Sequence, residues 1–147
     1  MNTVRMEIGV PGKYDLVKTR ELVQKWLDGD GDKIWFTPKK KSYGAVGFVF
    51  NEDDSTAQET VAMGLMKLAP EYFYQQQYLS GRDSVADVYG LEGFRGHNWY
   101  VKFFLHDDDD GQCVASVSFH PLDEVMKCEA GKVLEITYQG DRPWKSN

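Results

Sequence analysis

The segment WYVKFFLH, at residues 99–106, combines reactive side chains with an alternating pattern. Successive side chains of a β-strand point to opposite faces of its sheet. Four apolar side chains of this segment therefore share one face, as core residues do. The opposite face carries the phenol of Tyr100, the amine of Lys102 and the imidazole of His106.

A second strand, predicted at residues 112–120, follows the turn DDDDG and completes a hairpin. With the turn centred on Asp109, the expected cross-strand pairs are Lys102 with Ser116, Tyr100 with Ser118, and Asn98 with His120. This register predicts one polar face, made of Tyr100, Lys102, Ser116, Ser118 and His120. The other face is expected to pack against helices and consists of Trp99, Val101, Phe103, Cys113, Ala115, Val117 and Phe119.

A phenol, an amine and an imidazole within reach of one another could carry out acid–base chemistry on a phosphodiester. The amine would stabilise charge on the phosphate, and the imidazole or the phenol would move protons. The alternative is an ordinary hydrophilic sheet face, which half-exposed antiparallel sheets commonly have.

Two helices are predicted to support this hairpin. The first covers residues 14–32, begins at Asp15 as its N-cap and ends at Gly29 or Gly31. The second covers residues 55–70. Its capping box is either Ser55 with Gln58 or Thr56 with Glu59.

The remaining elements are mostly strands. They are predicted at residues 34–37, 45–50, 71–79, 84–90, 98–106, 112–120 and 132–140, with a short helix or loop at 121–131. This order predicts an α+β fold, in which two main helices pack on one face of a mostly antiparallel sheet. We expect a single domain over residues 1–147, with a core at about 6–138 and a poorly ordered tail at 139–147.

Composition places the chain among ordinary globular proteins, with 41% hydrophobic and 27% charged residues. The net charge of −6 is unlike the basic surplus of a dedicated nucleic-acid binder. It is compatible with a basic protein partner. Lys39, Lys40 and Lys41 form the one obvious basic cluster.

Cys113 and Cys128 match no metal motif and are expected to be free thiols. Without an apolar run of membrane-spanning or signal-peptide type, a soluble cytoplasmic protein is expected.

Acidic motifs do not predict a metal site. Asp28, Asp30 and Asp32 resemble the start of a calcium loop, but lysines stand where its glycine and glutamate are required. The DDDDG segment is typical of a solvated turn. The three histidines lack the short spacing of zinc ligands, and no nucleotide-binding or nucleophile-elbow fingerprint is present. We expect neither a metal nor a cofactor.

Several blocks of this chain, in the right order, resemble the MqsR toxins, which are bacterial messenger-RNA interferases with a RelE-like fold. The blocks are MEIGVPGKYDLVKTRELV, PEYFYQQQ after the second helix, ADVYG, WYVKFFL and ASVSFH. They span about residues 6–120. The loop at 37–54 is enlarged relative to the family, and residues after 121 form an extension.

The resemblance implies particular site residues. The catalytic tyrosine of the family falls on Tyr100, and the lysine two residues later on Lys102. The family's catalytic lysine falls on Tyr74, or on Gln75 with a slip of one residue, and its glutamine falls on Ala86. Two of three expected catalytic groups are therefore replaced.

The leading hypothesis is a divergent type II toxin–antitoxin ribonuclease. Tyr100 and His120 would transfer protons, and Lys102 would act with them on the phosphate. Substrate would be bound by Arg82, Tyr74 and Ser118. RNA and an inhibitory antitoxin protein are the implied partners, with no membrane partner.

Other interpretations stay open at this point. In one interpretation, the active site uses Arg82, Lys102 and His120 in place of the family's catalytic residues. In another, the resemblance is a coincidence of β-hairpin patterns. The chain can also be a non-catalytic binding or inhibitory module, related to phage or defence systems, that uses the acidic turn at residues 107–110. A small-molecule site among Tyr43, Trp99, Tyr74 and Tyr78 is a third alternative.

Overall fold

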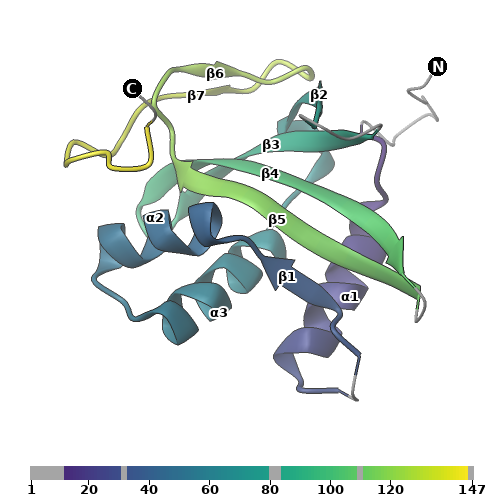
Figure 1. Cartoon of the computed structure of the whole chain (residues 1–147). Helices are drawn as coiled ribbons and strands as arrows, with labels where there is room; N and C mark the ends of the chain where they lie inside the picture. Colours follow the sequence, from purple (N-terminus) through teal and green to yellow (C-terminus); the bar gives the residue numbers. More distant parts are fainter. Residues whose placement is uncertain (1–11, 31–32, 80–83, 109–110, 146–147) are drawn as a thin grey trace.

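A five-stranded sheet with helices packed on one face forms the centre of the computed structural model, which describes residues 12–30, 33–79, 84–108 and 111–145 (Figure 1). The helices described are α1 (Leu16–Leu27), α2 (Lys40–Phe50) and α3 (Asp54–Leu65), with a 3-10 turn at Pro70–Tyr72. The sheet strands are β1 (Phe36–Pro38), β2 (Phe73–Tyr78), β3 (Val85–Phe94), β4 (His97–Asp108) and β5 (Gly111–Pro121). Their order is β1-β5-β4-β3-β2, and β1 pairs with β5 in parallel while the other pairs are antiparallel. The predicted α+β class with a mostly antiparallel sheet is confirmed.

Helix α1 begins and ends where the sequence predicts. The Asp15 carboxylate accepts a hydrogen bond from the Val17 N–H, at 2.8 Å, and so caps the first turn. Gly29 follows the last turn with a φ of +68°, a conformation that glycine adopts without steric cost. Leu16, Leu22 and Val23 are buried on the side that faces the sheet.

The predicted strand at residues 45–50 is wrong, because these residues form the second half of α2. Ser42, Ala45 and Val46 are the buried residues of this helix, and their spacing puts them on one helical face. Asn51 ends the helix in the left-handed conformation, with a φ of +55°. Packing against the sheet thus overrides the strand preference of the apolar residues, and three helices cover the sheet rather than two.

Neither predicted capping box is present at the next helix. The side chain of Asp53 caps α3 by accepting a hydrogen bond from the Thr56 N–H, at 2.8 Å. The helix therefore begins one residue earlier than predicted. Both Ser55 and Thr56 lie in its exposed first turn.

The register of the β4–β5 hairpin differs from the prediction. Near the turn Phe103 pairs with Ser116, whereas beyond an irregularity between Lys102 and Phe103 the pairs are Lys102 with Ser118 and Tyr100 with His120. One additional residue, Val117, is accommodated on β5, as in a β-bulge.

Between the turn and the bulge, where Phe104 pairs with Ala115, several residues of β5 lie on the face opposite to the predicted one, and the bulge restores the predicted faces of Ser118 and His120. Ser116 turns toward α2, where its hydroxyl lies 3.0 Å from the hydroxyl of Ser42. Ala115 and Val117 pack with Phe104 instead of with the helices, and Cys113, which pairs with His106, alternates with the helix-facing Val114. The helix-facing residues predicted correctly are Trp99, Val101, Phe103 and Phe119.

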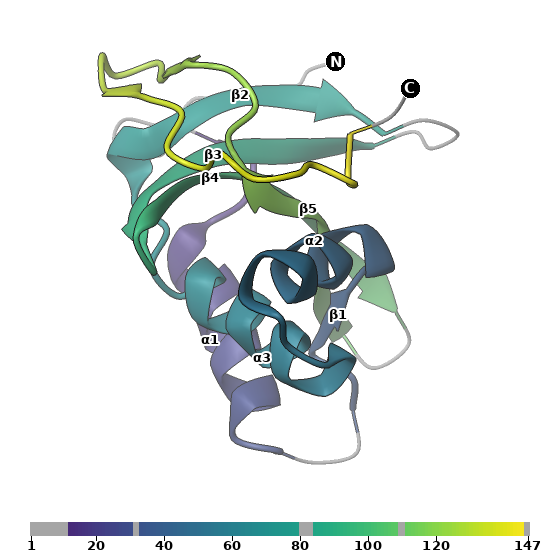
Figure 2. The same cartoon turned by 90° about the vertical axis from the view of Figure 1, so that its left-hand side faces the viewer.

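A small second hairpin lies over the sheet face that the helices leave open (Figures 1 and 2). It consists of β6 (Met126–Lys127) and β7 (Val133–Leu134), so the strand predicted over residues 132–140 is limited to two residues. A second buried cluster lies beneath it and contains Val88, Leu122, Met126, Cys128 and Leu134. Gly90 permits this packing, because a Cβ at that position would lie 2.5 Å from Leu134 Cδ1.

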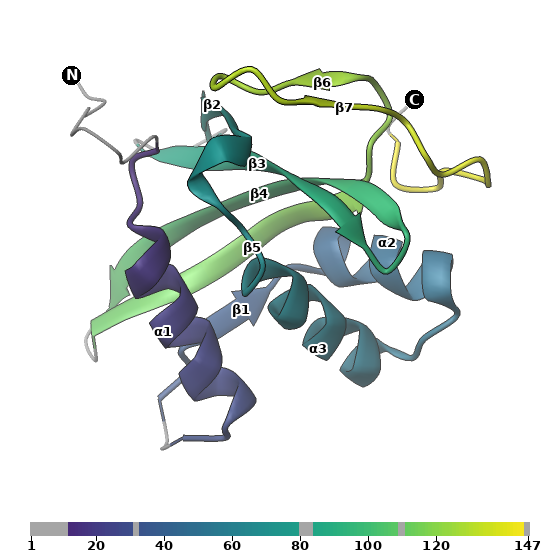
Figure 3. The same ribbon diagram turned by 180° about the vertical axis from the view of Figure 1, so that it is seen from behind.

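The chain that enters α1 is anchored to the sheet by a buried carboxylate. Asp87 on β3 is 0% exposed and accepts hydrogen bonds from the N–H groups of Lys13 and Tyr14, at 3.0 and 2.9 Å. Gly12 leaves room for this contact, since its Cβ would lie 2.4 Å from an Asp87 oxygen. Burial raises the pKa of Asp87, and the two backbone donors oppose that shift. In the view of Figure 3, α1 descends directly from this anchored segment.

Replacing Asp87 by asparagine is expected to destabilise the fold. The two N–H groups bind different oxygens of Asp87, and the amide replaces one oxygen by an NH2 donor, so one N–H group is left unpaired in a buried site, at a cost of about 1–3 kcal/mol. Urea unfolding at neutral pH measures this loss. Asp107→Asn, at an exposed position of β4, is the matched control and should leave the unfolding free energy nearly unchanged. Equal stability of the two variants would show that Asp87 is not the anchor.

Candidate functional site

Tyr100 and His120 form the centre of the candidate site on the sheet face opposite to the helices. They pair directly across β4 and β5, and their rings are stacked with centroids 5.0 Å apart and planes 10° from parallel. Lys102 and Ser118 are the next pair on the same face. The structure thus brings together four of the predicted site residues, in a register different from the predicted one.

The predicted residues differ in how accessible they are. Tyr74 lies beside Tyr100 and is half-buried. Ser118 is only 2% exposed, so its hydroxyl is covered in this structure. Arg82 lies outside the described residues. Ala86, at the position of the family's glutamine, is fully buried and offers no polar group.

The Lys102 amine has a defined partner, Gln77 on β2. Its Nζ donates a hydrogen bond to Gln77 Oε1 at 3.1 Å. Burial lowers the pKa of Lys102, and the nearby charge of Lys41 lowers it further. Burial also raises the pKa of Tyr100, so this phenol keeps its proton at neutral pH.

His120 is held in one orientation by its own backbone. Its Nδ1 lies 2.7 Å from the carbonyl oxygen of Pro121, and a carbonyl can only accept, so Nδ1 carries the proton. The other ring nitrogen, Nε2, has no hydrogen-bond partner among the described residues. Burial lowers the pKa of His120, outweighing the opposite effects of Pro121 and Asp123. A neutral imidazole with a free Nε2 lone pair can act as a general base.

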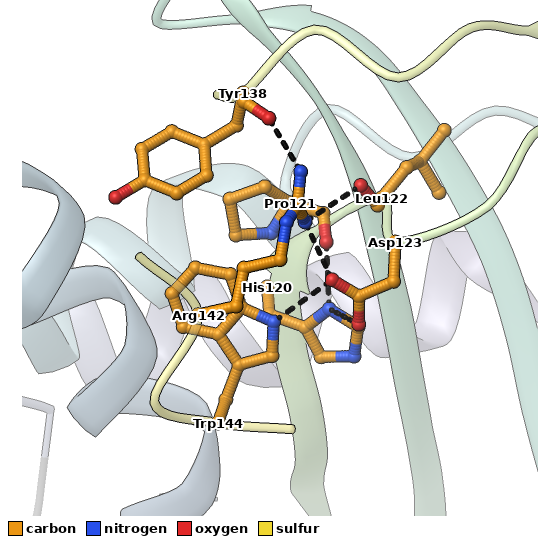
Figure 4. Close-up of polar contacts among 7 residues, drawn as sticks. All are labelled: His120, Pro121, Leu122, Asp123, Tyr138, Arg142 and Trp144. Carbon is orange, nitrogen blue, oxygen red and sulfur yellow. Dashed lines mark hydrogen bonds and ion pairs between the residues drawn. The ribbon is translucent and has the colours of Figure 1, made fainter. Parts of the chain in front are cut away.

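Asp123 connects His120 to the C-terminal segment (Figure 4). One carboxylate oxygen lies 3.6 Å from His120 Nδ1, while the other accepts hydrogen bonds from Arg142, at 2.5 Å, and from Trp144 Nε1, at 3.2 Å. Arg142 also donates to the carbonyl oxygens of Leu122 and Tyr138. Residues 139–145 are therefore held against the site through these contacts.

Trp144 extends the aromatic stack beyond His120. The two rings are 5.9 Å apart and 18° from parallel, so Tyr100, His120 and Trp144 form a continuous series. The Trp144 ring also packs at a steep angle against Phe48 of α2, with centroids 6.3 Å apart. The tail therefore covers one face of the candidate base.

A pocket of about 260 Å³ opens beside this stack. Its walls come from β2, β4, β5 and the segment that leads to β6. They are formed by Tyr74, Tyr100, His120, Leu122, Asp123, Glu124, Val125 and Met126. A small polar group can therefore reach the neighbourhood of His120 and Tyr100.

Sequence reasoning missed three contributors to this site, Asp123, Arg142 and Trp144. The available signal was the tryptophan and arginine in a segment otherwise rich in polar residues, because a large aromatic side chain rarely stays in solvent when a partner is near. The predicted small-molecule site is not formed, because Trp99 and Tyr43 belong to the helix-side core and Tyr74 to the opposite face.

Comparisons with known proteins yield no match: no family model, no curated protein and no solved structure is similar to this chain. No group of three or more potential ligands that could hold a metal ion occurs within residues 12–30, 33–79, 84–108 and 111–145. In the same ranges, no helix has the length and apolar character needed to cross a membrane.

The titration of His120 tests this description of the site. We expect its imidazole to titrate below the ordinary value of about 6.5, with the proton on Nδ1 in the neutral form. At pH values between the folded and unfolded pKa of His120, the unfolded chain binds the proton more tightly than the folded protein does. The unfolding free energy therefore decreases as the pH falls through this window. Nitrogen-15 NMR of the imidazole rings measures both the pKa and the tautomer.

Removing the charge of Asp123 should lower the pKa of His120 further, because Asp123 stabilises the imidazolium and Arg142 opposes it. Asp123→Asn provides this change, and Glu129→Gln, at an exposed position that does not line the pocket, is the charge-matched control. A His120 pKa above 6.5, or the same pKa in both variants, would contradict the geometry described.

Proposed function

We propose that this protein is an endoribonuclease that cleaves single-stranded RNA by attack of a 2′-hydroxyl on the adjacent phosphate. The single observation that carries the proposal is the state of His120. Burial lowers the pKa of His120, its Nδ1 lies 2.7 Å from the Pro121 carbonyl oxygen, and its ring stacks on Tyr100 beside the Lys102–Ser118 pair. RNA cleavage without a metal needs such a base, a cation for the phosphate and a proton donor.

The three side chains have distinct roles in the proposed reaction. Nε2 of His120 takes the proton of the 2′-hydroxyl, and the resulting oxygen forms a bond to phosphorus. The bond from phosphorus to the 5′-oxygen breaks, and Tyr100 gives its proton to that oxygen. Lys102 stabilises the added negative charge on the phosphate. The products are a 2′,3′-cyclic phosphate and a 5′-hydroxyl end.

The biological context we propose is a toxin of a toxin–antitoxin pair. It follows from the resemblance to the MqsR toxins, in which Tyr100 and Lys102 occupy matching positions. An antitoxin protein would then inhibit the enzyme by covering the open face around Tyr100.

A non-catalytic binding module is the second candidate, favoured by the C-terminal segment that covers one face of His120. In that case the stack of aromatic rings would recognise a partner and Nε2 would move no proton. The two candidates differ in one result, which is whether the purified protein breaks RNA.

Single substitutions at the site should reduce the rate of RNA cleavage strongly. We expect His120→Gln to lower the rate by about 10²–10⁴-fold, the usual contribution of a general base. Tyr100→Phe, which keeps the ring and removes the phenol oxygen, should also slow the reaction. Cleavage of a mixed-sequence RNA by the purified proteins provides the measurement.

The matched control is Tyr78→Phe, because Tyr78 lies on β2 and is 78% exposed. It should cleave RNA at the wild-type rate. Intact RNA after incubation with the wild-type protein would refute the proposal and favour the binding module. Equal rates for wild type and His120→Gln would show that the nuclease activity does not use this site.

A further inference from the structure

We propose that the cavity between α2 and the C-terminal segment binds one nucleotide of a single-stranded RNA. Its base would stack on Trp144 and Pro143, and its phosphate would lie beside Lys40 and Lys41. This inference deepens the proposed function and rests on it, since it names where the RNA strand continues after the cleavage site.

The cavity is large enough for such a ligand. It has a volume of about 500 Å³ and is lined by Lys40, Lys41, Gly44, Ala45, Pro143 and Trp144. Pockets that hold small ligands usually measure about 300–1,000 Å³. One wall is a flat indole next to a proline ring, and the other is a helix surface with two amines. A nucleotide has the same two parts, a flat base and an anionic phosphate.

Gly44 is the feature of this cavity that packing does not explain. Glycine in the middle of a helix lowers helix stability relative to alanine, yet a Cβ at Gly44 would meet no atom within 4 Å. The other glycine of this helix, Gly47, is different, because its Cβ would lie 2.9 Å from the Glu52 carbonyl oxygen. Gly44 lines the cavity, so its missing side chain keeps the cavity open.

Trp144 offers a fixed surface for a base. Its Nε1 donates a hydrogen bond to Asp123, its ring stacks on His120, and Phe48 and Tyr138 make further ring contacts with it. Trp144 is half-buried and lines the cavity, so part of its ring is available to a bound base. Stacking of bases on aromatic side chains is tolerant of sequence and is common in proteins that bind single strands.

Charge also links the cavity to the candidate active site. Lys41 acts electrostatically on both Lys102 and His120, so its amine lies close enough to influence the reacting groups. An RNA strand with one phosphate beside Lys102 can therefore place its neighbouring phosphate beside Lys41. This gives a locally basic path on a chain whose net charge is −6.

Filling the cavity tests the inference. Gly44→Leu puts a side chain into the space, and the probe is a fluorescein-labelled 2′-O-methyl oligoribonucleotide, which lacks the nucleophile and cannot be cleaved. We expect Gly44→Leu to weaken binding by about tenfold or more, the scale of one lost stacking contact, as measured by fluorescence anisotropy. Ser55→Leu, which adds the same side chain at an exposed helical position, should bind like the wild type.

A charge reversal provides an independent test that does not depend on repacking α2. Lys40→Glu should weaken binding, whereas Lys67→Glu, at an exposed lysine after α3, changes the net charge equally and should have little effect. If Gly44→Leu folds and binds as the wild type does, or if the two lysine variants bind equally, the subsite is refuted. Because the probe is not cleaved, binding that responds to Gly44→Leu supports the subsite even where RNA hydrolysis is absent.

Discussion

The pairing of β4 with β5, with its bulge opposite Lys102, is the constraint on which the other features of this protein depend. Between Trp99 and Lys102 the pairing fixes which side chains face the helices and which face the open side. The bulge then reverses the alternation on β5, so that Ser116 faces α2 while His120 stays beside Tyr100. One strand can thereby anchor a helix at one end and carry a reactive side chain at the other.

Burial gives the open face its chemical character. The β6–β7 cluster packs against Tyr100, and the C-terminal segment covers one face of His120. Burial raises the pKa of Tyr100 and lowers the pKa values of Lys102 and His120. A neutral imidazole is a base, and a protonated phenol is an acid. The Asp123 carboxylate raises the pKa of His120, but burial outweighs this effect and the charge of Arg142 also opposes it. The tail thus helps to set the properties of the residues that it covers.

The sequence predicts the parts of this fold that depend on local patterns. Asp15 and Gly29 delimit α1 as expected, since capping and left-handed turns are properties of neighbouring residues. Residues 45–50 are wrongly predicted as a strand, because their structure depends on packing against β5 and not on local preference. Four of the five polar residues predicted on one face of the hairpin lie there, and Ser116 does not, because neither the pairing at the turn nor the bulge has a local signal. Trp144 and Arg142 indicate that the tail packs against the protein, but their contacts join distant segments, so local patterns do not identify the surface that the tail covers.

The central proposal for this protein is that the face around His120 cleaves RNA by attack of a 2′-hydroxyl. The most direct measurement uses an RNA that the protein cleaves at a known bond, and a second RNA with a single 2′-deoxyribose on the 5′ side of that bond. Mass spectrometry of the products identifies both the bond and the new ends. We expect a 2′,3′-cyclic phosphate from the first RNA and an intact bond at that position in the second. Cleavage at the 2′-deoxyribose, or a product with a linear 5′-phosphate, would contradict the account.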